Sequence, residues 1–403
     1  MQQHIDILHE LALWLTHRVR SGARLEELFP DFSHKIARSG LPLWRSQLGL
    51  EVLHPEASGW MLVWQDEALA IRDRKRSEVL GKQIYLNSPT WVVDETGRPY
   101  RQRLEDGPQS MELLEELRLQ GATDYVMFPL PFLDHQRTAV MSFATQQTGG
   151  FSEREIATLR LAADLFSPYA ERHVLRRITV DLLDTYIGHR SGRRITDGQI
   201  ELGQIDHIEA AIWLTDLRGF TRYSEEAPIA EVIGALNAWL GPMVKVIESH
   251  GGEVLKFIGD AVLASFAAAD HGGGGNACRQ ALAAAEAFCA AIDGLNEQRG
   301  KAGLRRLDFG LGLHVGEVAY GNIGAATRLD FTVIGPAVNR AARLQELTKQ
   351  LGERVVISAD FAADAGLDLR DLGLHALRDV AGTQRVFAPR RLDPALTAGD
   401  QQA

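Results

Sequence analysis

Two aspartates lie where the chain pattern predicts the ends of strands. Asp216 ends the apolar, β-branched segment IEAAIWLTD, and Asp260 lies at the turn between EVLKFIG and AVLASF. Carboxylates that converge from a strand end and a hairpin tip would suit hard divalent cations such as Mg²⁺ or Mn²⁺. A lone aspartate in a turn is more often structural, so the chemistry depends on whether these two ends meet.

The residues after the first aspartate suit an anion. Gly219, Phe220 and Thr221 come directly before a predicted helix. The free N–H groups and the dipole at the start of a helix attract phosphate oxygens. An acid, a glycine turn and a helix start in this order therefore favour a site for a metal-bound phosphate compound.

The elements that position these residues belong to a second predicted module, which begins near residue 207. Its predicted strands are IEAAIWLTD, EVLKFIG, AVLASF, LDFGLGLHVGEVAYG, RLDFTVIG and RVVISADF. Its predicted helices cover 229–250, an alanine-rich stretch at 277–298 after the glycine-rich loop 271–275, and PAVNRAARLQELTKQ, with Pro336 in the first turn. His314 lies in a predicted strand and is expected to be structural.

The first module combines helices with a mostly antiparallel sheet. Residues 1–40 show helical periodicity, and a further helix is predicted in QSMELLEELRLQG, ending at Gly121. Short apolar runs bounded by turn residues predict strands. These are LGLEVL, GWMLVWQ, TWVVD, DYVMFPL and TAVMSFAT. The pattern predicts an α+β domain of about 150 residues.

A long helix is predicted between the modules, starting at FSEREIATLRLAADLF. Ser152 and Glu155 have the spacing of a capping box. The helical pattern continues past Pro168, where a kink is expected, and breaks at GHRSGRR, 188–194. The segment is interpreted as a connector that could carry a signal between the modules. An ordinary last helix of the first domain is the alternative.

Composition limits the classes of function. The 403 residues carry 43 basic and 53 acidic side chains, a net charge of −10, which argues against a non-specific nucleic-acid binder. Cys278 and Cys289 are too few for a disulfide framework or a thiolate zinc cage. The first residues lack the features of a signal peptide, and no uncharged apolar run reaches the ~20 residues of a membrane helix. The expectation is a cytoplasmic protein with no membrane partner.

Four segments, taken in order, resemble the catalytic domain of class III nucleotidyl cyclases, with a ferredoxin-like palm fold. They are WLTDLRGFT, EVLKFIGDAVLASF, GLHVGEVAYGNIG and FTVIGPAVNRAARLQE, within about residues 207–388. The resemblance implies that Asp216, Asp260 and the carbonyl of Leu217 bind two Mg²⁺ or Mn²⁺ ions per site. These ions would bridge the triphosphate of ATP and activate the ribose 3′-hydroxyl. Gly219, Phe220 and Thr221 would contact the phosphates, and no separate protein base is evident.

The resemblance also assigns polar residues of the helix that begins at Pro336. Asn339 and Arg343 match the pair that orients the ribose and stabilises charge on the α-phosphate, and their spacing places them on one helix face. Arg378 matches a phosphate-binding position, although Asp379 replaces the glycine that follows it in relatives. Pro336 and Arg340 also depart from the commoner residues, without removing a catalytic group.

Base choice follows from hydrogen bonding. Lys256 matches the purine-contacting lysine and can donate to adenine N1. Thr332 matches the second specificity position, and its hydroxyl can accept from the N6 amino group. Guanine would call for a carboxylate near N1, and none stands at either position. The pair resembles the Lys/Thr adenylate-forming subtype.

In this family, the metal ligands and the base and ribose contacts come from different protomers. This chain carries both sets, so the resemblance implies a head-to-tail homodimer that converts ATP into 3′,5′-cyclic AMP and pyrophosphate. The alternatives are a guanylate cyclase, a catalytically silent nucleotide-binding sensor and a diguanylate cyclase or polymerase-like palm domain. The last lacks the VNRAAR helix.

The first module resembles GAF-like sensor domains in its closing strands and final helix. A plain α+β dimerisation domain is the alternative. Both cysteines lie in the second module, which excludes a thioether-linked bilin in the sensor. The resulting layout is a GAF-like regulatory domain at 1–165, a helical connector at 166–204, a cyclase domain at 205–390 and a flexible tail at 391–403. A small-molecule or protein regulator is expected at the first domain.

Overall fold

The computed structural model describes residues 2–20, 22–51, 57–75, 83–133 and 139–390. These residues form two compact units, Met1–Thr185 and Tyr186–Ala403. Each unit is described by itself below. The predicted tail at 391–403 lies outside the described residues.

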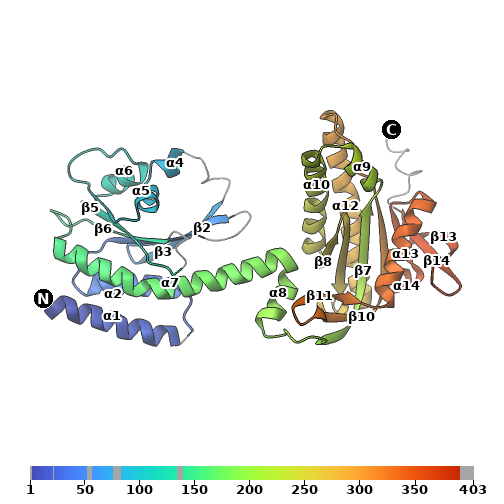
Figure 1. Cartoon of the computed structure of the whole chain (residues 1–403), viewed down its shortest axis with the longest axis horizontal. Helices are drawn as coiled ribbons and strands as arrows, with labels where there is room; N and C mark the ends of the chain where they lie inside the picture. Colours follow the sequence, from blue (N-terminus) through green and yellow to red (C-terminus); the bar gives the residue numbers. More distant parts are fainter. Residues whose placement is uncertain (1, 21, 52–56, 76–82, 134–138, 391–403) are drawn as a thin grey trace. The chain divides into compact units, whose positions relative to one another are not determined.

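The first unit is built on a six-stranded sheet of order β3-β2-β1-β6-β5-β4 (Figure 1). All five strand pairs are antiparallel. The strands are β1 (Arg45–Glu51), β2 (Ala57–Gln65), β3 (Ala68–Lys75), β4 (Tyr100–Arg103), β5 (Asp124–Pro129) and β6 (Ala139–Thr145). The helices are α1 (Gln2–Arg20), α2 (Leu25–Arg38), α4 (Gln83–Leu86), α5 (Pro89–Thr96), α6 (Glu112–Leu119) and α7 (Glu153–Ile187).

The two faces of this sheet are covered by different helices. Helices α1, α2 and α7 pack on one face through a large apolar core that includes Phe32, Leu48 and Phe166. Helices α5 and α6 pack on the opposite face through a smaller core. The predicted α+β composition of this unit is therefore confirmed.

The segment TWVVD was predicted as a strand, and this prediction is wrong. It lies in α5, which begins at Pro89 and ends before Gly97. The hydroxyl of Ser88 accepts a hydrogen bond from the N–H of Trp91, and Gly97 adopts a left-handed conformation. Caps at both ends stabilise the short helix more than the β-branched valines oppose it.

Helix α7 begins with the predicted capping box. The N–H of Ser152 donates to Glu155 Oε2 at 2.7 Å, and the N–H of Glu155 donates back to the Ser152 hydroxyl at 3.3 Å. The helix continues through Pro168. The predicted break in the basic stretch 188–194 is confined to Gly188, because His189–Thr196 forms the separate helix α8.

The second unit contains an eight-stranded sheet of order β13-β14-β12-β10-β7-β9-β8, with β11 paired to β10. The strands are β7 (Ile205–Leu217), β8 (Glu253–Ile258), β9 (Ala261–Ala267), β10 (Phe309–Ala325), β11 (Arg328–Ile334), β12 (Val355–Ser358), β13 (Leu369–Ala376) and β14 (Thr383–Pro389). The helices are α8, α9 (Phe220–Glu226), α10 (Ile229–Ser249), α11 (Ala268–His271), α12 (Gly274–Lys301), α13 (Pro336–Leu351) and α14 (Ala359–Ala365).

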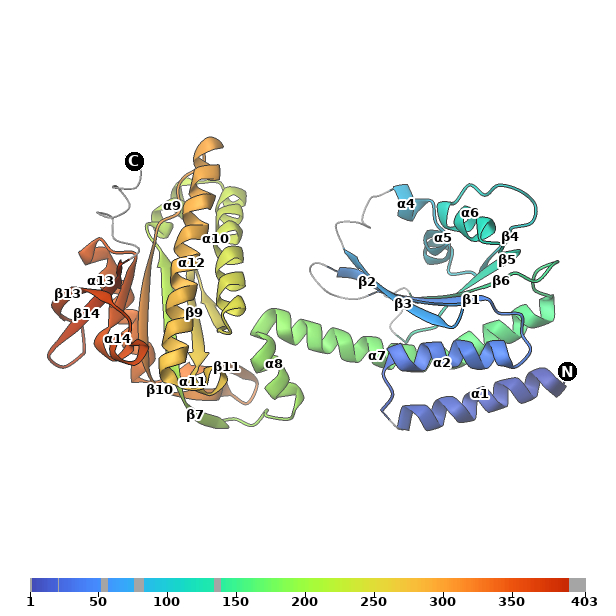
Figure 2. The ribbon, with the colours of Figure 1, turned by 180° about the vertical axis from the view of Figure 1, so that it is seen from behind.

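Helices α10 and α12 cover one face of this sheet, as Figure 2 shows, and α13 covers part of the other. Within the described parts, α10 alone is long and apolar enough to cross a membrane by length and composition. One face of α10 packs on the sheet through Ala235, Trp239, Met243 and Ile247.

Candidate active site

The register of two neighbouring strands brings the two aspartates together. Thr215 of β7 pairs with Val262 of β9, so Asp216 lies beside the start of β9, next to Asp260 in the β8–β9 turn. A hydrogen bond joins the two half-buried carboxyl groups. Burial, this hydrogen bond and the charge of Asp260 raise the pKa of Asp216 to about 7. The convergence on which the metal-site prediction depended is therefore present.

A buried tryptophan holds the hairpin tip that carries Asp260. Trp239 of α10 donates from Nε1 to the carbonyl oxygen of Asp260 at 3.3 Å. Its ring is fully buried and lies 5.0 Å from the ring of Phe288 and 5.3 Å from that of Phe309. Gly259 supplies the positive φ of the turn. Sequence analysis missed this role of Trp239, because nothing in the pattern of α10 indicates a contact with the hairpin.

The segment after Asp216 is fixed by Arg218. Its guanidinium donates to the carbonyl oxygens of Thr348 and Glu353, at 3.2 and 2.7 Å, and to the Asp308 carboxylate at 3.1 Å. The side chain of Leu217 is buried. These contacts tie the backbone next to Asp216 to the last turn of α13, to the loop after it and to the residue before β10, a role that the sequence pattern did not reveal.

The predicted phosphate-contacting turn follows Arg218. Gly219 has φ +70° and precedes α9, which has seven residues. Gly219 and Thr221 are exposed, and Phe220 is half-buried. The turn is accessible beside the aspartates, and its contact with phosphate stays a prediction.

The donor set of the aspartate pair fits a divalent cation. Among the described residues no group of three or more His, Cys, Asp or Glu side chains has the arrangement of a metal site. Two carboxylates and a backbone carbonyl are nevertheless hard oxygen ligands, as Mg²⁺ prefers when it keeps several waters. A cation between Asp216 and Asp260 would also oppose the burial and the repulsion that together raise the pKa of Asp216.

The residues predicted to recognise the base lie on adjacent elements. Lys256 of β8 forms an ion pair from Nζ to Asp330 Oδ2 of β11. Asp330 and Thr332 are two positions apart on one strand and share a face. The structure thus places Lys256 at the strand of Thr332, and it adds Asp330, which sequence analysis did not consider. A carboxylate is therefore present beside Lys256, although neither predicted base position carries one.

Helix α13 carries Asn339 and Arg343 at its outer face. It approaches β10 closely at Gly312, where an added Cβ would lie 2.2 Å from the carbonyl oxygen of Ala341. Asn339 is exposed. Arg343 forms ion pairs with Glu346 at 2.7 Å and with Asp379 at 3.5 Å.

The second predicted phosphate ligand joins the same cluster. Arg378 contacts Glu346 at 3.3 Å and Asp379 at 3.7 Å. Asp379 has φ +62°, a left-handed conformation that favours glycine. Arg343 and Arg378 therefore share two acidic counterions, and Asp379 has a backbone conformation that residues other than glycine rarely adopt.

The other predicted residues make no direct polar contact with the two aspartates. In the part of the chain that the structure describes, no hydrogen bond or ion pair links either aspartate to Lys256, Thr332, Asn339 or Arg343. His314 is buried on β10, where its Nδ1 lies 2.8 Å from the Ser358 hydroxyl and burial lowers its pKa to about 4. That environment agrees with the structural role expected for it.

Part of the second unit is similar to known proteins. Residues 204–363 match the model of the adenylate and guanylate cyclase catalytic domain. An adenylate cyclase of Anabaena cylindrica is 40% identical over 159 residues, which are 40% of this chain and 31% of that protein. Adenylate cyclase 1 of Rhizobium meliloti is 32% identical over 157 residues, 38% of this chain and 23% of that protein.

The match is limited to part of each protein. The chain spans a third or less of the length of these curated relatives. The crystal structure of the adenylyl cyclase CyaB from P. aeruginosa covers 47% of this chain and 99% of its own, with 27% identity and a TM-score of 0.43. The C-terminal half of the chain thus contains a catalytic domain of the adenylate and guanylate cyclase family.

Proposed function

We propose that the protein is an adenylate cyclase that converts ATP into 3′,5′-cyclic AMP and pyrophosphate. The observation that carries this proposal is the meeting of Asp216 and Asp260 within the matched region. Two carboxylates held together against their repulsion are a site built for cations. The adenylate cyclases among the relatives support the reaction class.

The roles of the residues follow from their positions. Asp216, Asp260 and the Leu217 carbonyl hold two Mg²⁺ or Mn²⁺ ions. When bound, such ions activate the ribose 3′-hydroxyl and stabilise the leaving pyrophosphate. Arg343 stabilises charge on the α-phosphate, because its guanidinium is permanently charged and matches phosphate oxygens. Asn339 orients the ribose.

Triphosphate contacts come from two further places. Arg378 lies in the same cluster as Arg343. The Gly219–Thr221 turn adds backbone N–H groups beside the aspartates.

The base is proposed to be adenine. The Lys256 ammonium group donates to N1, and the Thr332 hydroxyl accepts from the N6 amino group. One observation favours guanine as the second candidate. The Asp330 carboxylate at Lys256 could accept from guanine N1–H.

Turnover of ATP and GTP by the purified full chain, with Mg²⁺ and with Mn²⁺, decides between the two bases. Preferential formation of cyclic AMP supports the proposal, and preferential formation of cyclic GMP makes the chain a guanylate cyclase. Absence of both products would leave a nucleotide-binding protein. In Asp330→Asn, loss of GTP turnover alone would identify Asp330 as a guanine contact.

The complete site is proposed to form between two copies in a head-to-tail homodimer. What supports this is that no hydrogen bond or ion pair joins the aspartates to Asn339 or Arg343 within the described part of one chain. Large apolar side chains are also exposed on α10 and at the β8–β9 hairpin. Ile229 is 72% exposed, Ile233 52%, Phe257 51% and Ile258 53%.

Complementation tests the shared site. Asp216→Ala and Asn339→Ala chains are each expected to be inactive. A heterodimer of the two contains one intact site out of two, so mixing should restore part of the wild-type rate. Cyclic AMP formation measures this, and size-exclusion chromatography of differently tagged chains confirms the heterodimer. Confirmed heterodimers without activity would refute the shared site.

The remaining assignments concern the rest of the chain. Residues 1–165 are proposed as a regulatory domain, 166–204 as the connector and 205–390 as the catalytic domain, in a cytoplasmic protein. Regulation predicts that deleting residues 1–170 changes the rate of cyclic AMP formation. An unaltered rate in an intact dimer would contradict it.

A further inference from the structure

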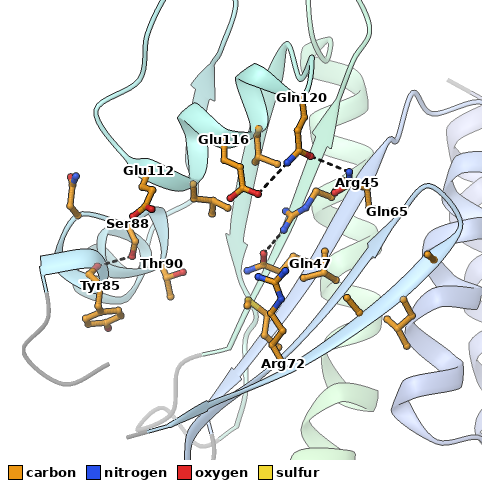
Figure 3. A pocket seen from close by; sticks show the side chains of 18 residues that line it. Arg45, Gln47, Gln65, Arg72, Tyr85, Ser88, Thr90, Glu112, Glu116 and Gln120 are labelled. Carbon is orange, nitrogen blue, oxygen red and sulfur yellow. Dashed lines mark hydrogen bonds between the residues drawn. The ribbon is translucent and has the colours of Figure 1, made fainter. Parts of the chain in front are cut away.

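A cavity of about 780 Å³ lies in the first unit, between the sheet and the short helices (Figure 3). Strands β1, β2 and β3 form its floor, and residues of α4, α5 and α6 and of their connections form its wall. The volume falls in the range of small-molecule sites, roughly 300–1,000 Å³. The two catalytic aspartates lie in the other unit, so this cavity is separate from the proposed cyclase site.

The part of the cavity floor that β1 forms is polar, although helices cover it. In β1, Arg45 and Gln47 point to the cavity, whereas Leu48 and Leu50 belong to the apolar core on the other face. Arg45 is only 7% exposed and Gln47 only 4%. A covered sheet face normally carries apolar side chains, so buried polar groups in this position need a partner.

Arg45 is a buried charge whose hydrogen-bond partner is a neutral amide. Its Nη2 donates to Gln47 Oε1 at 3.0 Å, and no described carboxylate forms an ion pair with it. Burial has the largest effect and lowers its pKa, the charges of Tyr125 and Glu116 oppose this, and the charge of Arg72 lowers the pKa again. A guanidinium has five N–H donors, so one neutral amide satisfies it poorly.

A second guanidinium faces the same space. Arg72 of β3 also lines the cavity and lies on the same sheet side as Arg45 (Figure 3). No described residue forms an ion pair with Arg72. Two like charges that point into one cavity repel each other, and an anion between them would turn this repulsion into two attractions.

The opposite wall of the cavity carries two acidic side chains, one of which already accepts a hydrogen bond. Glu116 of α6 accepts a hydrogen bond from Gln120 Nε2 at 3.1 Å, and Gln120 Oε1 accepts one from Gln65 at 3.2 Å. Glu112 lines the same wall. These carboxylates disfavour a ligand that is anionic at both ends, and they favour one with an N–H or O–H donor at its far end.

We propose that this cavity binds a small organic anion whose carboxylate or phosphate group lies between Arg45 and Arg72. A hydrogen-bond donor at its other end faces Glu112 and Glu116. Apolar side chains supply the contacts in between: Met61, Val63, Leu69, Leu113 and Leu117. The cavity lies in the first unit and the aspartates lie in the second. Anion binding can be measured without cyclase turnover, so this proposal does not depend on the proposed cyclase reaction.

Calorimetric titration of the full chain tests the proposal with three probes. 4-Aminobenzoate carries a carboxylate and a distal amine, phenyl phosphate carries a phosphate, and 4-aminobenzamide is the neutral match of the first. At least one anion is expected to bind saturably and at least about tenfold more tightly than the amide, as a charge-assisted hydrogen bond requires. The tighter anion identifies carboxylate or phosphate as the preferred group.

Three variants locate the binding. Arg45→Gln and Arg72→Gln are expected to weaken anion binding at least about tenfold, whereas Arg98→Gln, an exposed arginine outside the cavity, should leave it unchanged. Arg72 is exposed and safe to replace, so its variant keeps the test valid if Arg45→Gln fails to fold. The proposal is overturned if neither anion binds, if the amide binds as tightly, or if Arg72→Gln binds like wild type.

Discussion

Each of the two units holds a pair of like-charged side chains at one site, and the pairs differ in how the repulsion can be relieved. In the C-terminal unit, Asp216 and Asp260 share a hydrogen bond, and the pKa of Asp216 rises to about 7. In the N-terminal unit, Arg45 and Arg72 line one cavity. A carboxyl group can take up a proton near neutral pH, but a guanidinium does not lose one in that range.

In a third pair of like charges, the chain itself supplies the counterions. Arg343 and Arg378 also lie together, but Glu346 and Asp379 stand beside both of them. The chain supplies its own counterions here, so an incoming phosphate must compete with them. The comparison suggests three kinds of binding. The aspartate pair would exchange a proton for a cation, and the cavity of the first unit would bind an anion. Arg343 and Arg378 would exchange their carboxylate partners for phosphate.

The largest expected effect is on the aspartate pair itself. Asp216→Asn and Asp260→Asn should each lower the rate of cyclic AMP formation by more than about 100-fold, because loss of a direct ligand exceeds the 10–100-fold typical of an outer partner. Asp293→Asn is the matched control, since this acid contacts only Arg354 among the described residues. Near-normal turnover by either active-site variant would remove the basis for a metal site.

The next effect concerns the pH dependence of the melting temperature, measured with a chelator so that no metal ion is bound. The folded pKa of Asp216 lies above the value near 4 of an unfolded aspartate. The folded state therefore holds the proton more tightly, and its free energy of unfolding falls as pH rises from about 4 to about 7. Asp216→Asn removes this penalty, so its melting temperature should exceed that of wild type at pH 8, and the difference should shrink as pH falls and vanish near pH 4.

Metal provides the control for this titration. Mg²⁺ or Mn²⁺ at pH 8 should raise the melting temperature of wild type more than that of Asp216→Asn, because binding to the folded state alone stabilises it. The same difference in melting temperature between the two proteins at pH 4 and at pH 8 would show that the pKa of Asp216 is not raised in the folded state.

The sequence predicted those parts of the site that depend on the ends of elements. Asp216 at a strand end and Asp260 at a hairpin tip meet because neighbouring strands in register bring such ends together. Asp330 was missed because its partner Lys256 is distant in sequence. Glu346 could have been found, since it lies three residues after Arg343 on the same helix.

The fold was less predictable where local and tertiary signals compete. The caps Ser88 and Gly97 stand in the sequence around TWVVD, but the β-branched residues between them favoured a strand. The first strand was predicted to begin at Leu48, whereas it begins at Arg45. Arg45 and Gln47 were therefore not recognised as strand residues. Polar residues at alternate strand positions also resemble a solvent-facing side, and the sequence does not show that a helix covers them.

The smallest expected effect concerns the arginines that already have counterions. Asp379→Gly removes one of the two acids beside Arg343 and Arg378 and places glycine where φ is +62°. Because the ion pairs are partly exposed and worth about 0.2–1 kcal/mol each, the KM for ATP should fall by no more than about fivefold. Initial rates at varied ATP measure this, with Asp371→Gly as a control for an exposed acid on β13. A higher KM in Asp379→Gly would mean that Asp379 holds the two guanidinium groups in place for the phosphates. For Arg343 and Arg378, as for the two aspartates, the position of the charged groups would then matter more than the neutralisation of their charge.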